Sequence, residues 1–166
     1  MLTRRQIALG ALAAGGVGVT AIALRSIGVR ATAAAPGKFE VSHTPAEWRK
    51  LLTPEQYAVL REQGTERPFS SPHDREKRKG TFTCAGCDLP LFASETKFDS
   101  GTGWPSFYAP IEGAVEKDTD YSFGFVRDQV HCHHCGGHQG HIFNDGPKPT
   151  GLRYCINGVA MKFVAA

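Results

Sequence analysis

The chain has 166 residues, of which 41% are hydrophobic and 21% are charged, a composition typical of a globular protein rather than a disordered one. Its formal charge is +3, but residues 1–33 contain four arginines and no acid, so the other 15 basic and 16 acidic residues give −1. A weakly acidic remainder without a basic patch argues against nucleic-acid binding. That remainder, about 130 residues, is long enough for one domain with its own hydrophobic core.

The N-terminal residues 1–35 predict an export signal. Arg4 and Arg5 precede an uncharged run, 7–24, that is rich in glycine and alanine, and A-x-A cleavage sites follow it. This order is typical of a secretory signal, and the paired arginines resemble a twin-arginine signal. We therefore expect an exported, periplasmic protein whose folded domain is 40–166. The alternatives are an uncleaved membrane anchor, for which the run is barely long enough, and a cytoplasmic protein.

Two short helices are predicted at the start of the folded domain. Thr44 and Thr53 each precede a proline and stand three residues before Glu47 and Gln56, which is the capping-box pattern. Apolar residues follow at helical spacing, and Gly64 is expected to end the second helix. The residues expected to cover a core are Trp48, Leu51, Leu52, Tyr57, Val59 and Leu60.

After residue 80 the chain consists of short β-like runs separated by glycine, proline and aspartate. Strands do not alternate with helices, and no GxGxxG or phosphate-binding loop is present, so a nucleotide-binding parallel sheet is not expected. We expect a mainly β domain of antiparallel strands with the short helices in front. The predicted strands are 80–84, 91–92, 115–118, 122–126, 141–144 and 152–163, the last with a break allowed at 157–158.

The five cysteines divide into two C-x-x-C pairs and one single residue. Two such pairs complete a tetrahedral site without an open position, which is typical of structural zinc and would link metal binding to folding. The alternatives are iron, two disulfides, or a site in which His133 or His134 replaces a cysteine. These histidines and His131 are otherwise expected to be exposed. The predicted zinc ligands are Cys84, Cys87, Cys132 and Cys135.

The remaining thiol, Cys155, has polar neighbours. Arg153 and Asn157 lie two residues away on either side, so the three share one face of a strand. A cation beside a thiol lowers its pKa and favours the reactive thiolate. Asn157 could donate a hydrogen bond to a substrate oxygen or hold a water. His138 and His141 could lie on one side of a loop and donate protons near neutral pH.

Several motifs resemble those of the methionine sulfoxide reductase B family, in the same order along the chain. They are GTERPF at 64–69, GTGWPSF at 101–107, GHQGHIFNDGP at 137–147, PTGLRYCING at 149–158, and both cysteine pairs. The resemblance covers roughly residues 43–164. It implies a fold of two antiparallel sheets in a small barrel-like sandwich with a structural zinc.

The resemblance also implies an activity, the thiol-dependent reduction of methionine-R-sulfoxide to methionine, mainly in oxidised proteins that are thereby repaired. Cys155 would be the nucleophile and become a sulfenic acid. The resemblance places His138 and His141 in the active site, and Arg153 and Asn157 are expected to assist Cys155. Further residues are expected to bind substrate: Trp104, whose indole would pack on the methyl group, Phe143 and Asp145. Asp145 could instead orient Arg153 or a histidine, or serve a turn.

Many members of this family carry a second, resolving cysteine within 101–107, where this chain has Thr102. No other thiol is available without the loss of a metal ligand. Oxidised Cys155 must therefore be reduced by a thioredoxin-like protein or a small thiol. We expect a monomer. Two alternatives from other classes are a zinc-based interaction module without catalysis, and a thiol peroxidase or redox sensor in which Cys155 reacts with peroxide.

Overall fold

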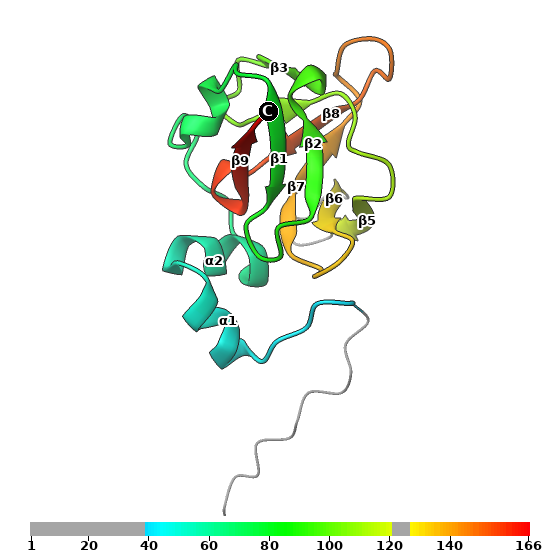
Figure 1. Ribbon diagram of the computed structural model, residues 1–166. Coiled ribbons are helices and arrows are strands. Elements are labelled where there is room, and N and C mark those ends of the chain that lie inside the picture. Colours follow the sequence, from blue (N-terminus) through cyan, green and yellow to red (C-terminus); the bar gives the residue numbers. More distant parts are fainter. Residues whose placement is uncertain (1–38, 121–126) are drawn as a thin grey trace, which may run out of the picture. The chain divides into compact units, whose positions relative to one another are not determined.

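The structure is a computed structural model that describes residues 39–120 and 127–166 (Figure 1). The predicted export signal at 1–35 and the predicted strand at 122–126 lie outside the described residues. Within the part of the chain that is described, none of the helices has the length and apolar character needed to cross a membrane.

The two predicted helices, α1 (Pro45–Leu51) and α2 (Pro54–Glu62), begin at the expected residues. In each, the N-cap threonine and the side chain three residues later exchange hydrogen bonds with each other's backbone, so both capping boxes form. The end of α2 differs slightly from the prediction. Gln63, with φ of 57°, takes the left-handed position, and Gly64 N–H then closes the turn on the Ala58 carbonyl at 2.9 Å.

The apolar residues of the helices cover the core, with one exception. Trp48, Leu52, Val59 and Leu60 are buried, whereas Leu51 is 61% exposed. The prediction for Leu51 was wrong because adjacent helical residues point about 100° apart, so only one of two consecutive leucines faces the core.

The described residues form two antiparallel sheets and three short 3₁₀ helices. The smaller sheet has the order β2–β1–β9 and comprises β1 (Gly80–Cys84), β2 (Pro90–Ala93) and β9 (Met161–Ala165). The larger sheet, in the order β3–β4–β8–β7–β6–β5, comprises β3 (Lys97–Phe98), β4 (Ser106–Phe107), β5 (Val115–Asp120), β6 (Arg127–Cys132), β7 (His138–Phe143) and β8 (Arg153–Ile156). The 3₁₀ helices are η1 (Pro72–Arg75), η2 (Ser94–Thr96) and η3 (Gly158–Ala160).

This mainly β, two-sheet fold confirms the predicted class, and the differences lie in short or polar strands. The structure divides the predicted strand 152–163 into β8, η3 and β9, with the break after β8. β7 begins three residues earlier than predicted because the turn after the second cysteine pair leads directly into it, with Cys132 N–H bound to the Gly137 carbonyl. β3, β4 and β6 were not predicted, since two-residue strands and a strand as polar as β6 carry little alternation.

The two sheets pack face to face through aromatic side chains. Phe107 of β4 lies against Phe82 of β1 and Phe92 of β2, with ring centroids 5.1 and 4.3 Å apart, and Phe92 also contacts Tyr154 of β8. Such pairs contribute about 0.5–1.5 kcal/mol each beyond the burial of apolar area. Because Tyr154 faces this core and side chains alternate along a strand, the next residue, Cys155, faces outward from the sandwich.

Candidate active site and metal site

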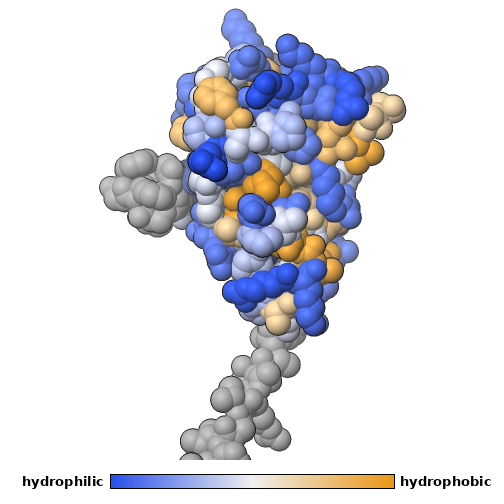
Figure 2. Space-filling view, turned by 90° about the vertical axis from the view of Figure 1, so that its left-hand side faces the viewer, coloured by the Kyte–Doolittle hydropathy of each residue, from blue (hydrophilic) through white to orange (hydrophobic). Residues whose placement is uncertain are grey.

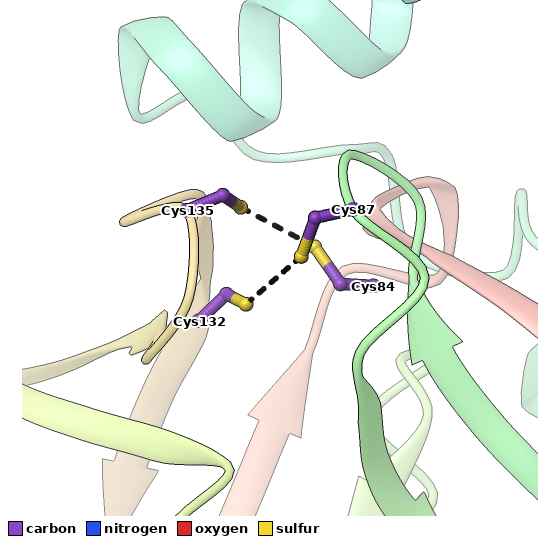
Figure 3. Close-up of side chains that lie close together, drawn as sticks. All are labelled: Cys84, Cys87, Cys132 and Cys135. Atoms are coloured by element: carbon purple, nitrogen blue, oxygen red, sulfur yellow. Dashed lines mark hydrogen bonds between the residues drawn. The ribbon is translucent and has the colours of Figure 1, made fainter. Parts of the chain in front are cut away.

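The four paired cysteines meet at one point (Figure 3). Their Sγ atoms all lie within 4.8 Å of one another, with Cys84 and Cys135 3.7 Å apart and Cys87 and Cys132 3.5 Å apart. Sulfurs about 2.3 Å from a tetrahedral zinc would be about 3.8 Å apart, whereas disulfide sulfurs are about 2.05 Å apart. The cluster therefore fits a tetrahedral metal ion, and the structure does not support the two-disulfide alternative.

The cysteine cluster joins the two sheets. Cys84 ends β1 of the smaller sheet, and Cys132 ends β6 of the larger one. The same turn closes each pair, because Asp88 N–H donates to the Cys84 carbonyl and Gly136 N–H to the Cys132 carbonyl, both at 2.9 Å. An ion held here would cross-link segments that are far apart in sequence.

The histidines beside the second pair are not part of the cluster. His133 and His134 each lie against a glutamate carboxylate, at 2.8 and 3.3 Å, and the group of close metal-binding side chains contains only cysteines. The expectation that His131 is exposed was wrong, since it is only 6% exposed. Its ring packs edge-on against Phe39 and lies 3.3 Å from the Asp118 carboxylate.

Cys155 lies in a pocket of about 140 Å³. In the sheet it is directly opposite Ser106 of β4 on one side and His141 of β7 on the other. Residues paired across antiparallel strands point to the same face, so the thiol and the imidazole project together. The pocket is lined by Thr65, Trp104, Gly140, His141, Phe143, Cys155 and Asn157. Trp104 and Phe143 give it apolar walls.

Burial raises the pKa of the Cys155 thiol above its usual value. The charge of Arg153 and hydrogen bonds from Thr102 and Arg153 lower that pKa, but they do not outweigh burial. The predicted direction of the Arg153 effect is therefore correct, while the free site still favours the neutral thiol. Thr102 is itself held in a chain of hydroxyls, 2.8 Å from Ser100, which is 2.8 Å from Ser106.

Arg153 is fixed by Asp145. Its Nε and Nη2 each donate to one carboxylate oxygen at 2.8 Å, and its guanidinium carbon lies 4.3 Å from the ring centre of Phe143. The paired hydrogen bonds raise the pKa of Arg153 and lower that of Asp145. Asp145 is not among the residues that line the pocket, so of its expected roles the geometry favours orientation of Arg153.

The two histidines of the motif lie together on β7, with ring centroids 5.3 Å apart, rather than on a loop. Residues three apart in a regular strand point to opposite faces. Here the pairing with β6 shifts between Val130 and His131, so that Gln139 is an extra residue, a β-bulge, and His138 turns toward His141. His141 lines the pocket, and His138 is 3% exposed.

Asn157 lies beyond β8, at the start of η3, and lines the pocket although it is only 3% exposed. Its Oδ1 accepts from the Glu66 N–H and its Nδ2 donates to the Gln139 carbonyl, both at 3.0 Å. One amide proton of Asn157 remains for a substrate oxygen, so the side chain can serve both as a structural link and as a donor.

Glu66 was not predicted to have a role, yet it connects the walls of the pocket. Its carbonyl accepts from Trp104 Nε1 at 3.1 Å, and its carboxylate accepts the N–H groups of Gly158 and Val159 at 2.7 and 2.8 Å. Burial raises the pKa of Glu66. The motif 64–69 includes Glu66, but hydrogen bonds between a side chain and main-chain groups leave no pattern of residue types in a sequence.

A larger depression of about 570 Å³ is lined by residues of α2, η1 and η3 and by much of the segment 64–73. Figure 2 faces the side of the molecule on which α2, η1 and β9 lie, and shows hydrophobic patches among hydrophilic residues. The depression shares Thr65 with the smaller pocket, but no cysteine lines it. A thiol-based reaction therefore belongs to the smaller pocket.

A thiol between a guanidinium and an imidazole suits a thiol-based oxidoreductase, since simple binding would require none of these reactive groups. Comparison with known proteins is more specific. The SelR domain model matches residues 52–165, a range that contains the whole pocket. Relatives named peptide methionine sulfoxide reductase MsrB are 58% identical in Pseudomonas putida W619, 56% in Agrobacterium fabrum and 52% in Leptospira interrogans. Each alignment covers 75% of this chain and 94%, 93% and 96% of the relative, respectively.

The chain therefore belongs to the MsrB family of methionine sulfoxide reductases and is an oxidoreductase. The similarity supports methionine sulfoxide reductase activity rather than a non-catalytic zinc module or a peroxidase.

Proposed function

We propose that this protein reduces the R epimer of methionine sulfoxide in oxidised proteins, with Cys155 as the nucleophile, and thereby repairs them. The observation that carries the proposal is the Cys155 thiol in one pocket with the His141 imidazole and the rings of Trp104 and Phe143. Sulfoxide reduction needs a nucleophile, a proton donor and an apolar seat for the methyl group. The volume of about 140 Å³ is below that of pockets that enclose whole ligands, and suits the end of one side chain.

In the first half of the cycle, the sulfur of Cys155 attacks the sulfoxide sulfur while His141, with His138 against it, donates a proton to the oxygen. The methionine sulfur gains two electrons and leaves as the thioether. The Cys155 sulfur loses two electrons and keeps the oxygen as a sulfenic acid. Arg153, which opposes the effect of burial on the thiol pKa, favours the thiolate during the attack.

In the second half, an external thiol attacks the sulfenic acid of Cys155, so that water leaves and a mixed disulfide forms. A second thiol then attacks this disulfide and releases Cys155. The other four thiols lie in the metal cluster, and Thr102 occupies the place of a resolving cysteine. The reductant is therefore a thioredoxin-like protein or a small thiol.

The four clustered cysteines would hold a structural zinc ion, whose chemistry here is to cross-link the two sheets. Four sulfur ligands leave no open position for substrate, so every step at the pocket falls to the side chains.

The test of the proposed activity uses both epimers of N-acetyl-methionine sulfoxide with a dithiol or thioredoxin as reductant. Wild-type protein should reduce the R epimer and leave the S epimer unchanged, and Cys155→Ser should reduce neither. Activity that survives Cys155→Ser would refute the mechanism. In a single turnover without reductant, a dimedone adduct should form on Cys155, and no intramolecular disulfide should appear.

We propose further that residues 1–35 direct export to the periplasm by the twin-arginine route, and that the folded domain is a monomer. Replacement of Arg4 and Arg5 by lysine should leave the precursor in the cytoplasm, as judged by fractionation, because this route reads the arginine pair. Unchanged export would point to a general secretory signal, and a membrane-bound product of full length to an uncleaved anchor.

A further inference from the structure

Phe69 is an exposed aromatic residue beside the pocket. Among the described residues, three large hydrophobic side chains are mainly exposed: Leu51 at 61%, Phe69 at 60% and Val164 at 55%. Leu51 ends α1, and Val164 lies on β9 of the smaller sheet. An exposed hydrophobic residue needs no explanation by itself. Phe69 differs from the other two in its backbone and in its neighbours.

The backbone of Phe69 is strained, with φ of 63°. The left-handed region is unfavourable for L residues, and a bulky side chain there is a true outlier. Glycine would adopt this conformation without cost. Phe69 is therefore unfavourable in two respects. Its backbone conformation does not suit a phenylalanine, and its apolar ring is exposed to water. Strained backbone conformations cluster at active sites and at residues that bind ligands.

The position of Phe69 is fixed against the loop that borders the Cys155 pocket. Its N–H donates to the Gly103 carbonyl at 2.7 Å, and a side chain on Gly103 would lie 2.8 Å from the Phe69 ring. Gly103 stands between Thr102, whose side chain lowers the pKa of the Cys155 thiol, and Trp104, which lines the pocket. The Phe69 ring therefore packs on Gly103, and the two residues that flank Gly103 are close neighbours of Cys155 or of its pocket.

The segment that carries Phe69 is anchored to the pocket at several points. Thr65 lines the pocket, and Glu66 is bound to Asn157, to Trp104 and to the start of η3. An exposed ring on an anchored backbone loses little freedom when it contacts a ligand, which favours binding. The pocket itself has room for a side-chain end only, so the residues that flank a methionine sulfoxide must lie outside it.

We propose that Phe69 is a substrate-binding residue that packs against the residues next to the methionine sulfoxide in an extended polypeptide. This inference rests on the proposed reductase function and deepens it, because it assigns the contact that distinguishes a polypeptide substrate from a single amino acid. Apolar flanking residues gain most from this contact, because both partners lose apolar surface to water.

The test compares two substrates, N-acetyl-methionine-R-sulfoxide amide and a short unstructured peptide with the R-sulfoxide between leucines. Phe69→Gly removes the ring and relieves the strain, while Phe69→Leu keeps an apolar contact. Phe69→Gly should raise KM for the peptide about tenfold, with kcat unchanged and with both constants for the small substrate unchanged. Phe69→Leu should restore most of the peptide KM.

The matched controls are Leu51→Ala and Val164→Ala, which remove equally exposed apolar side chains elsewhere. Both should leave the peptide KM unchanged. Equal losses on the two substrates in Phe69→Gly, an unchanged peptide KM, or an equal effect in a control variant would overturn the inference. If wild-type protein failed to reduce the small R-sulfoxide at all, the proposed function would fail instead.

Discussion

Asn157→Ala should destabilise the protein substantially, although the residue borders a pocket. The substitution removes two hydrogen bonds of 3.0 Å. The Glu66 N–H loses its acceptor, the buried Asn157 Oδ1, and the Gln139 carbonyl loses one of its donors, Asn157 Nδ2. The orphaned N–H costs about 1–3 kcal/mol and the lost donor about 1 kcal/mol, since the Gln139 carbonyl keeps its bond from the Asn157 N–H at 2.8 Å. The expected loss is therefore about 3 kcal/mol, or roughly 10 °C in Tm for a domain of this size.

Asn157→Asp tests the same geometry without a change of shape. One carboxylate oxygen still accepts from Glu66 N–H, but the other faces the Gln139 carbonyl and repels it. At neutral pH this variant should be at least as unstable as Asn157→Ala, because an ionised carboxylate is buried. Burial raises the folded-state pKa of the introduced acid above its unfolded value of about 3.9, so the variant regains stability relative to wild type as pH falls through that raised pKa.

Differential scanning calorimetry at fixed zinc concentration measures both effects, with wild type and Asn157→Ala as references at pH 7 and pH 5. The gap between Asn157→Asp and wild type should narrow at the lower pH, while that of Asn157→Ala stays constant. The reasoning is refuted if Asn157→Ala melts within about 2 °C of wild type, or if Asn157→Asp is as stable as wild type at pH 7.

Three other expectations concern thiols. Thr102→Cys places a thiol where a side chain already reaches Cys155, so one turnover without reductant should end in an intramolecular disulfide by mass spectrometry; persistent sulfenic acid would contradict this. Because a raised pKa reduces the thiolate fraction at neutral pH, iodoacetamide should alkylate Cys155 more slowly in the native than in the unfolded protein, and still more slowly in Arg153→Met. Faster alkylation of Arg153→Met would show that the guanidinium does not favour the thiolate. A mercurial with a chelator should release one zinc ion per chain and abolish the β circular dichroism signal. Cys87→Ser should weaken metal retention. A folded, metal-free protein would contradict the structural role of the metal.

The parts of the fold that depend on local chemistry were predictable. Both capping boxes are short-range patterns, and their helices begin where expected. The strand Gly80–Cys84 was predicted with its correct ends, because it is a compact β-forming run between turn residues. β3 and β4 have two residues each and exist only because neighbouring strands pair with them. No local pattern specifies such strands.

In the candidate active site, too, local features were predictable and features set by tertiary structure were not. The alternation of a strand was enough to bring Arg153 beside Cys155, and the spacing of the cysteine pairs was enough to predict one cluster. The roles of Glu66 and Gln139 depend on backbone groups and on a bulge, which are properties of the folded chain rather than of residue types. Leu51 and His131 were misplaced for a related reason, since tertiary packing decides which polar or apolar side chains are covered.

The bulge at Gln139 also limits how this protein can vary in length over evolution. Deletion of Gln139 would remove the extra residue of the bulge, and with it the carbonyl that accepts hydrogen bonds from the Asn157 side chain and backbone. Insertion of one residue between Cys135 and His141 would move His141 out of register with Cys155 while Cys135 stayed in its cluster. Gaps in this short stretch should therefore be selected against, and length differences among functional variants should fall in other turns, away from the link between the second cysteine pair and the histidines.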